Sequence, residues 1–149
     1  TNFTINLGLS WANYGNGRKD EGSSRGAFRH ALWQALITKS FDYETALDIG
    51  KGHDPNIPEY KNSYDKLSDA DTIADTLNNI IGRSIGINSN KSNTEITEEV
   101  LNFQYELGLY NVKKNEDGTY SVCLTKLSNE EYNSAMKKLS NLNDNGMNK

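Results

Sequence analysis

The chain has 149 residues, 35% of them hydrophobic, and a formal net charge of −4 at pH 7, which predicts one domain over residues 1–149 with a core of its own. Its charges are interspersed and form no basic stripe, so the sequence gives no strong signal for nucleic-acid binding. No apolar run approaches the ~20 residues of a membrane span, and the lone Cys123 excludes an internal disulfide. Because the chain starts at Thr1, we expect it to be part of a longer parent polypeptide that delivers it.

The first half of the chain predicts an extended N-terminal arm followed by three helices. Residues 1–23 are polar and rich in glycine and asparagine, and their alternating apolar residues predict a short strand or an extended arm: Phe3, Ile5, Leu7, Leu9 and Trp11. A helical pattern spans about residues 24–39. A second helix is expected to begin with Asp42 as its N-cap and to end at the Gly-Lys-Gly sequence of residues 50–52. The third covers about residues 68–85, with Ser68 and Asp71 as a capping-box-like start.

The second half predicts a helix, a hairpin and a final helix. Ser92 or Thr94 is placed to cap a helix that runs to Gly108. Residues 109–124 alternate around an Asn-Glu-Asp-Gly turn, which is typical of a β-hairpin, and a second capping box starts at Ser128. The fold class is therefore mostly α: about five helices with one small β-hairpin near 109–124. We expect a site-bearing helical core over residues 26–86 and a helix-hairpin-helix unit over residues 94–142.

The first of these helices has no ordinary solvent face. At ~100° per residue, Phe28 and Leu32 share one face with their apolar neighbours. His30 and Trp33 lie on the opposite face, and a helix that is apolar on most sides is usually central and buried. His30 is therefore expected to project into a partly enclosed place, with Arg29 at its flank.

The third helix carries a stripe of short polar residues. Asp71, Asp75, Asn78 and Gly82 follow one another at spacings of 4, 3 and 4, and Asn79 lies at the edge. Each costs helix stability, by roughly 0.5–1 kcal/mol relative to alanine. The stripe predicts a place where oxygens are held close to the helix for a metal, a water or a polar ligand. The alternative is a solvated face or an Asn/Asp network that braces a neighbouring segment.

Two histidines with nearby carboxylates support two chemistries. One is a single divalent metal ion held by His30, His53 and Asp75, with a water in the open position. The other is a histidine general base held in its working tautomer by a carboxylate. The candidate catalytic residues are His30, His53, Asp54, Asp75, Arg29 and Arg83, and the candidate substrate-binding residues are Trp33, Gln34, Asn78 and Asn79. Both arginines have two interpretations, because either can pair with the Asp stripe or hold an anionic group of a substrate.

Three sequence blocks carry a resemblance to a known family. They are FRHALWQAL at residues 28–36, GKGHD at 50–54 and DTLNNIIGR at 75–83. Over about residues 26–86 the chain resembles small bacterial domains found in secreted proteins and at the C-termini of polymorphic-toxin and Rhs-type polypeptides. It departs from their pattern at Leu32, which replaces an aromatic residue, at Gln34, which replaces Asn, and at Asp54, which replaces Glu. The resemblance implies a bacterial toxin or effector domain that is secreted or delivered into a target cell, with a cognate immunity protein as partner.

These observations lead to a functional hypothesis with two alternatives. The first is a hydrolase that acts on a cell-envelope or small anionic substrate through a His/Asp site. The second is a structural or adaptor domain without enzymatic activity, in which the His/Asp/Asn residues form a buried network. The third is a metal-dependent nuclease toxin.

Overall fold

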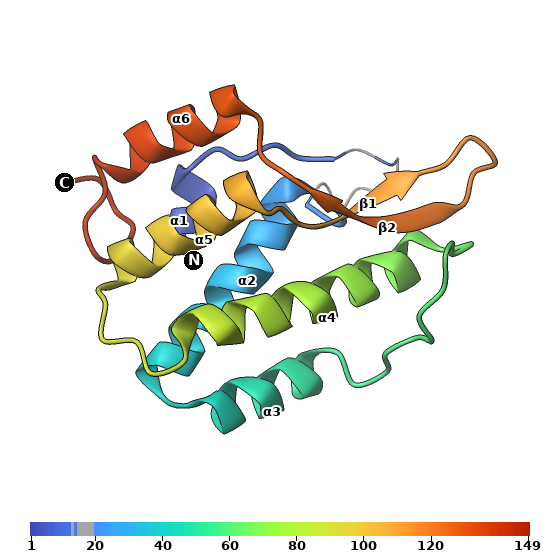
Figure 1. Ribbon diagram of the computed structural model, residues 1–149, viewed down its shortest axis with the longest axis horizontal. Helices are drawn as coiled ribbons and strands as arrows, with labels where there is room; N and C mark the ends of the chain where they lie inside the picture. Colours follow the sequence, from blue (N-terminus) through green and yellow to red (C-terminus); the bar gives the residue numbers. More distant parts are fainter. Residues whose placement is uncertain (13, 15–19) are drawn as a thin grey trace.

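The computed structural model describes residues 1–12, 14 and 20–149. These residues form six α-helices and one two-stranded antiparallel sheet (Figure 1). The elements are α1 (Asn2–Asn6), α2 (Ser24–Ser40), α3 (Tyr43–His53), α4 (Leu67–Gly86), α5 (Asn93–Glu106), β1 (Leu109–Lys114), β2 (Tyr120–Thr125) and α6 (Asn129–Leu139). The mostly α fold with one hairpin is confirmed. Within these residues, no helix is both long and apolar enough to cross a membrane.

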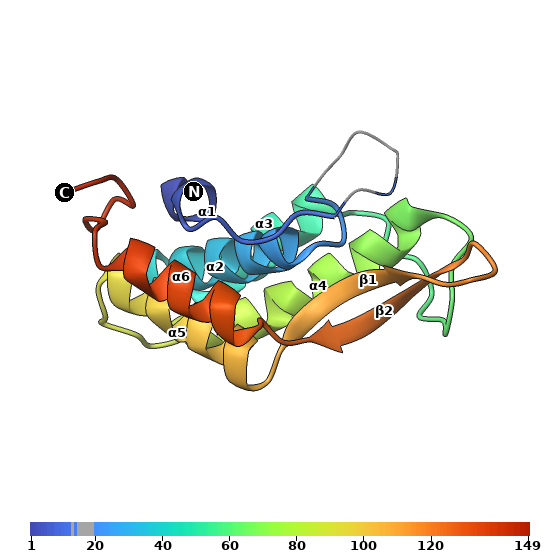
Figure 2. The same ribbon diagram turned by 90° about the horizontal axis from the view of Figure 1, so that it is seen from above.

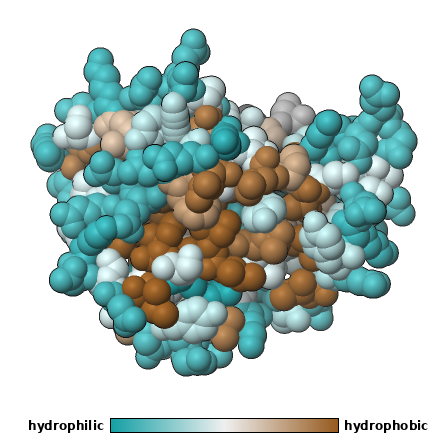
Figure 3. All heavy atoms as spheres, in the orientation of Figure 1, coloured by the Kyte–Doolittle hydropathy of each residue, from teal (hydrophilic) through white to brown (hydrophobic). Residues whose placement is uncertain are grey.

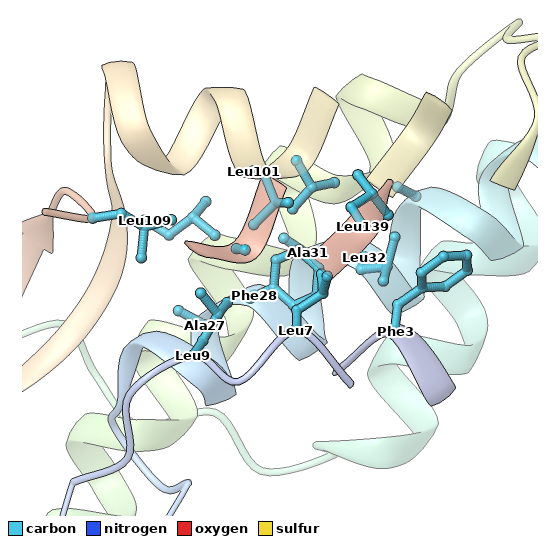
Figure 4. Packing of buried hydrophobic residues seen from close by; sticks show 14 of the residues in the cluster. Phe3, Leu7, Leu9, Ala27, Phe28, Ala31, Leu32, Leu101, Leu109 and Leu139 are labelled. Atoms are coloured by element: carbon cyan, nitrogen blue, oxygen red, sulfur yellow. The ribbon is translucent and has the colours of Figure 1, made fainter. Parts of the chain in front are cut away.

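Helix α2 lies in the middle of the arrangement and contacts most of the other elements. It packs against α3, α4 and α5, and it also contacts α1 and β1 (Figures 1 and 2). Its buried face meets side chains from α1, α5 and α6 in the main core (Figure 4). The labelled residues of this core are Phe3, Leu7, Leu9, Ala27, Phe28, Ala31, Leu32, Leu101, Leu109 and Leu139.

Three helices begin at the N-caps that their sequences predict. The side chain of Asp42 accepts a hydrogen bond from the backbone N–H of Thr45 at the start of α3. Ser92 forms a complete capping box at the start of α5, and the side chain of Ser128 caps α6. In each case the side-chain oxygen of the N-cap residue accepts a hydrogen bond from a backbone N–H of the first turn, which has no partner within the helix. This is why such starts can be predicted from a few residues.

The expectation of a strand or extended arm over residues 1–23 was wrong at its beginning, because residues 2–6 form α1. Thr1 caps this helix through a bond from the N–H of Thr4. Phe3 and Leu7 are four residues apart and both buried, whereas Ile5 between them is 63% exposed. The pattern of burial therefore follows a helical turn and not the alternation of a strand. The part of the expected arm at residues 13 and 15–19 lies outside the described residues.

Two predicted helix boundaries were also wrong. Helix α3 continues through residues 50–52 and ends at His53, just before Asp54 and Pro55. Gly50 is buried there and faces the side chains of Gln34 and Arg83, so packing overrides its low helix propensity. Helix α4 begins at Leu67, and its N-cap residue is Lys66, which forms no side-chain cap bond, so the expected capping box of Ser68 and Asp71 is absent. The carboxylate of Asp71 instead accepts a hydrogen bond from the backbone N–H of Gly22.

Two glycines of α4 let its backbone touch that of α2. A Cβ atom placed on Gly82 would lie 2.2 Å from the carbonyl oxygen of Ala31, and one on Gly86 would lie 2.2 Å from that of Ala35. No real Cβ atom tolerates contacts this short, so these positions require glycine for close approach. The two Gly–Ala contacts fix how α4 crosses α2, and thereby which side chains of the two helices meet.

The face turned toward the viewer in Figure 3 carries a patch of apolar side chains. A groove of about 300 Å³ lies on α4, α5 and the hairpin. Its apolar lining consists of Leu77, Ile80, Ile81, Phe103, Leu107 and Leu124. The polar residues discussed below line other cavities.

Candidate functional site

The structure brings the two histidines together. His30 lies on α2, one turn before Gln34, and His53 is the last residue of α3. Their ring centroids are 5.9 Å apart, and the Trp33 ring lies 6.1 Å from His30 and 5.5 Å from His53. These three rings line a pocket of about 320 Å³ together with Thr1 and Arg29. An aromatic and cationic pocket is therefore formed where α2 meets the end of α3.

His30 is held from below by one turn of α4. Its Nε2 lies 3.1 Å from Oδ2 of Asp75 and its Nδ1 lies 3.2 Å from Oδ1 of Asn79, and the residue is 3% exposed. Asp75 and Asn79 are four residues apart, so they present both oxygens on the same face of the helix. When the imidazole is protonated, both of its N–H groups have an acceptor.

These contacts favour the charged form of His30. Burial alone lowers the pKa of the imidazole, and the charge of Arg29 acts in the same direction. The hydrogen bond and negative charge of Asp75, with the bond to Asn79, outweigh both effects, so the pKa of His30 lies above its ordinary value of 6.5. The contacts of His30 with Asp75 and Asn79 therefore favour a positive charge on its imidazole.

Asp71 lies one turn before Asp75 and is kept in the neutral form. Burial raises its pKa, and the negative charges of Asp75 and Glu21 add to this effect. The N–H of Gly22, which donates to Oδ1 at 2.7 Å, and the charge of His30 oppose it, and the pKa of Asp71 is about 8. Asp71 therefore holds a proton at neutral pH and ties α4 to the segment just before α2.

His53 differs from His30 in being exposed. Among the described residues, no side chain or backbone group forms a hydrogen bond or an ion pair with its imidazole, and its contacts are with the rings of His30 and Trp33. It is the last residue of α3, and its imidazole is open to solvent and to a molecule in the pocket.

The two candidate arginines lie in different places. Arg29 lines the histidine pocket, is 40% exposed at its side chain and pairs with Asp20 at 2.6 Å. Arg83 is buried, donates to Oε1 of Gln34 at 2.7 Å and lies over the ring of Tyr43 at 5.6 Å. In the described part of the chain, neither arginine pairs with an acid of the α4 stripe.

Two residues predicted to bind substrate have structural contacts. Gln34 is fully buried and binds the guanidinium of Arg83. Asn78 is fully buried and pairs with the backbone of Tyr110, donating to its carbonyl at 2.9 Å and accepting its N–H at 2.8 Å. The Nε2 group of Gln34 has no hydrogen-bond partner among the described residues, so substrate binding by these two amides stays a prediction.

Asp54 and Asn79 border a second, smaller cavity of about 110 Å³, which Arg83 also lines. His53 and Asp54 are consecutive, and Asn79 contacts His30 on one side and this cavity on the other. Most of the predicted site residues are therefore divided between two neighbouring cavities, with His30, His53, Trp33 and Arg29 in the larger one, whereas Asp75, Gln34 and Asn78 line neither.

The expected metal ligands are not arranged around a common point. Within residues 1–12, 14 and 20–149, no group of three or more His, Cys, Asp or Glu side chains is placed to hold a metal ion. Both ring nitrogens of His30 already face Asp75 and Asn79. A divalent ion bound by His30, His53 and Asp75 stays a prediction, and it requires these bonds to rearrange.

A family model matches the segment that carries most of this site. The family model described as a domain of unknown function, DUF6973, matches residues 6–108. The chain belongs to this family. No curated protein and no solved structure matches the chain. The matched segment ends at Gly108, so it includes α2 to α5 and stops before the hairpin. It contains every lining residue of the two polar cavities except Thr1.

Sequence reasoning missed part of the site. The role of Asp71 as a buried neutral acid depends on Gly22 and Glu21, which precede it by about 50 residues. Its place in the polar stripe of α4 was the only signal for it. The buried Glu21 was missed altogether, because nothing in the glycine-rich first 23 residues marks it as an interior residue.

Proposed function

We propose that this DUF6973 domain is a hydrolase that acts on a small or cell-envelope substrate carrying a negative charge. The observation that carries the proposal is the pairing in one pocket of an exposed His53 with a buried His30, whose pKa is raised by its contact with Asp75. Proton transfer and charge stabilisation are the two demands of metal-free hydrolysis. The exposed His53 suits proton transfer, and the buried His30 beside Asp75 suits charge stabilisation.

In this mechanism His53 is the general base. Its imidazole takes a proton from a water whose oxygen attacks the electrophilic centre of the substrate. The same proton then passes from His53 to the leaving group, so that one water is consumed and the base is restored. His53 suits this task because it is exposed and its imidazole is not bonded to a described residue.

His30 and Arg29 supply the positive charge. The contacts of His30 with Asp75 and Asn79 favour its protonated form, and Arg29 lines the same pocket. Charges that are already in place lower the free energy of the transition state where negative charge develops. They also attract an anionic substrate, which accounts for the preference proposed here. The Trp33 ring forms one wall against which the substrate packs.

The test compares two variants of one helix. His53→Gln removes the base from the end of α3, whereas Asp48→Ala changes an exposed residue of the same helix outside the pocket. We expect His53→Gln to lower hydrolysis of a panel of anionic phosphate and carboxylate esters by ~10²-fold or more, with Asp48→Ala at the wild-type rate. Full activity in folded His53→Gln would reject the mechanism.

The biological part of the proposal is a bacterial effector that is delivered by its parent polypeptide and blocked by an immunity protein. Support comes from the three sequence blocks, which lie in α2, α3 and α4 beside the pocket. Expression in the cytoplasm and in the periplasm tests it, because a cell-envelope substrate predicts killing from the periplasm alone. Equal growth of cells that express the domain in either compartment would contradict it. Metal analysis of the purified domain, with chelator treatment, tests whether a divalent ion is bound.

The second candidate is a domain without enzymatic activity. Burial of His30 between Asp75 and Asn79 favours this view, since the same contacts stabilise a fold. It predicts that His30→Ala lowers stability by about 1–3 kcal/mol and that no pocket substitution changes a biological readout. A substitution of the exposed His53 that abolishes toxicity without loss of stability would exclude this candidate.

A further inference from the structure

The smaller cavity has two unsatisfied charged groups of opposite sign. Arg83 is buried, and within the described residues the only hydrogen bond of its guanidinium is to Gln34, while its Nε has no partner. Asp54 lines the same cavity, and its buried Oδ2 has no partner either. A buried charge without a counter-charge destabilises a fold unless a ligand supplies the missing partner. The two groups share a cavity of about 110 Å³ without forming an ion pair.

The other walls of the cavity add a cation and an apolar surface. Lys51 is exposed and stands at the cavity beside Arg83. Leu47 and Ile57 give it an apolar side. A ligand that fits has a negative group for Arg83 and Lys51, a hydrogen-bond donor for Asp54 and a small apolar part between them. The volume restricts it to a few non-hydrogen atoms.

The geometry points to a subsite for a carboxylate with an N–H group on the adjacent α-carbon. This is the chemistry of a small amino acid or of the last residue of a peptide. The carboxylate would bind Arg83 and Lys51, the N–H would donate to Asp54 and a small side chain would pack on Leu47 and Ile57. Asn79 borders this cavity and also bonds His30, and Asp54 follows His53, so the subsite adjoins the histidine pocket.

The subsite deepens the substrate class of the hydrolase proposed above, and only its interpretation as the end of a substrate rests on that function. Because Asp54 directly follows His53 and Asn79 bonds His30, a peptide bound by its carboxyl end would bring a neighbouring bond toward the larger pocket. The binding itself does not require catalysis. Ligand affinity and turnover can therefore be measured separately.

Binding is tested by calorimetry and by the amide NMR signals of Gly50 and Lys51, with three small probes. N-acetyl-alanine represents a peptide end, free alanine an amino acid, and propionate a carboxylate without a nitrogen. We expect N-acetyl-alanine or alanine to bind roughly tenfold more tightly than propionate, a difference of about 1.4 kcal/mol for one added hydrogen bond. Whichever of the two binds more tightly identifies the source of the ligand.

The variants avoid the buried Arg83, whose loss can unfold the protein. Asp54→Ala is expected to remove the preference over propionate, and Lys51→Ala to weaken all three probes, whereas Asp48→Ala on the exposed part of α3 leaves them unchanged. His53→Gln should bind as the wild type does, so loss of hydrolysis with retained binding separates the two proposals. The subsite is rejected if no probe binds, if propionate binds as well as the others, or if neither variant alters binding.

Discussion

Replacing Gly82 by alanine is expected to disturb the fold and the histidine pocket together. The new Cβ would lie 2.2 Å from the carbonyl oxygen of Ala31 and 3.0 Å from its Cα. Both atoms belong to backbone, so no side chain can turn away to make room. The contact must widen to at least 3.0 Å, which requires α4 to move away from α2. His30 on α2 would then move away from Asp75 and Asn79 on α4.

The magnitude follows from two opposing effects. Overpacking of a close contact costs about 1–3 kcal/mol, while alanine gains up to ~1 kcal/mol over glycine inside a helix. Gly52 of α3 measures the gain alone, because a Cβ there meets nothing within 4 Å. We expect Gly52→Ala to be neutral or stabilising and Gly82→Ala to lower Tm, by about 2–4 °C for each kcal/mol lost.

Two measurements check this reasoning. Thermal and denaturant unfolding give the stability of both variants, and NMR titration of the His30 ring gives its pKa. In Gly82→Ala the pKa of His30 should fall from its raised value, because its bonds to Asp75 and Asn79 lengthen while its burial remains. A Gly82→Ala protein as stable as Gly52→Ala, with an unchanged His30 titration, would refute the close crossing as the determinant of the site.

Three further predictions concern α4. Asp75→Asn should lower the pKa of His30 and reduce the stability of the fold below pH 6.5. A histidine with a raised pKa stabilises the fold at low pH and loses this contribution as pH rises through its folded pKa. Unfolding measured from pH 5 to 8 checks this prediction, and parallel curves of stability against pH for variant and wild type would contradict it. Asp71→Asn should raise Tm at pH 8–9. The carboxyl of Asp71 has a pKa of about 8 in the folded protein and 3.8 in the unfolded chain, so the stability of the wild type falls as pH rises between these values. An unchanged Tm at pH 9 would show that Asp71 ionises without penalty. Asn78→Ala removes both hydrogen bonds to the Tyr110 backbone. Denaturant unfolding should show a loss of about 1–3 kcal/mol in the free energy of unfolding, with normal hydrolysis by the folded fraction. A variant as stable as the wild type would mean that β1 is held by other contacts.

Local signals predicted most of the helices and the hairpin. The caps Asp42, Ser92 and Ser128 act within three residues of themselves, so a short stretch of sequence is enough to place them. Helix α1 could not be predicted in this way. Its five residues are too few for intrinsic stability, and the burial of Phe3 and Leu7 in the main core, which no local pattern specifies, sets its face.

The sequence predicted which face of its own helix a site residue occupies, but not which residues of other elements it contacts. The spacing of Asp75 and Asn79 placed both on one side of α4. The helical pattern of residues 24–39 placed His30 on the face of α2 opposite Phe28 and Leu32. What each residue of the α4 stripe meets depends on the crossing at Gly82 and Gly86 and on distant segments. Asn78 and Asn79 are neighbours in sequence, yet one binds β1 and the other binds His30. A single sequence contains no signal that distinguishes them.

The short polar residues of α4 do not by themselves argue for catalysis. Asp71 holds Gly22, Asn78 holds Tyr110, and Asp75 with Asn79 holds His30, so each can be explained by the packing of α4. His53 has no such explanation, because it is exposed and forms no hydrogen bond with the described residues, yet its ring centroid lies 5.9 Å from that of the buried His30. His53→Gln therefore separates the two accounts most cleanly. If the pocket serves only the fold, stability and biological effect both stay at wild-type values; if it serves hydrolysis, activity is lost while the unfolding curve is unchanged.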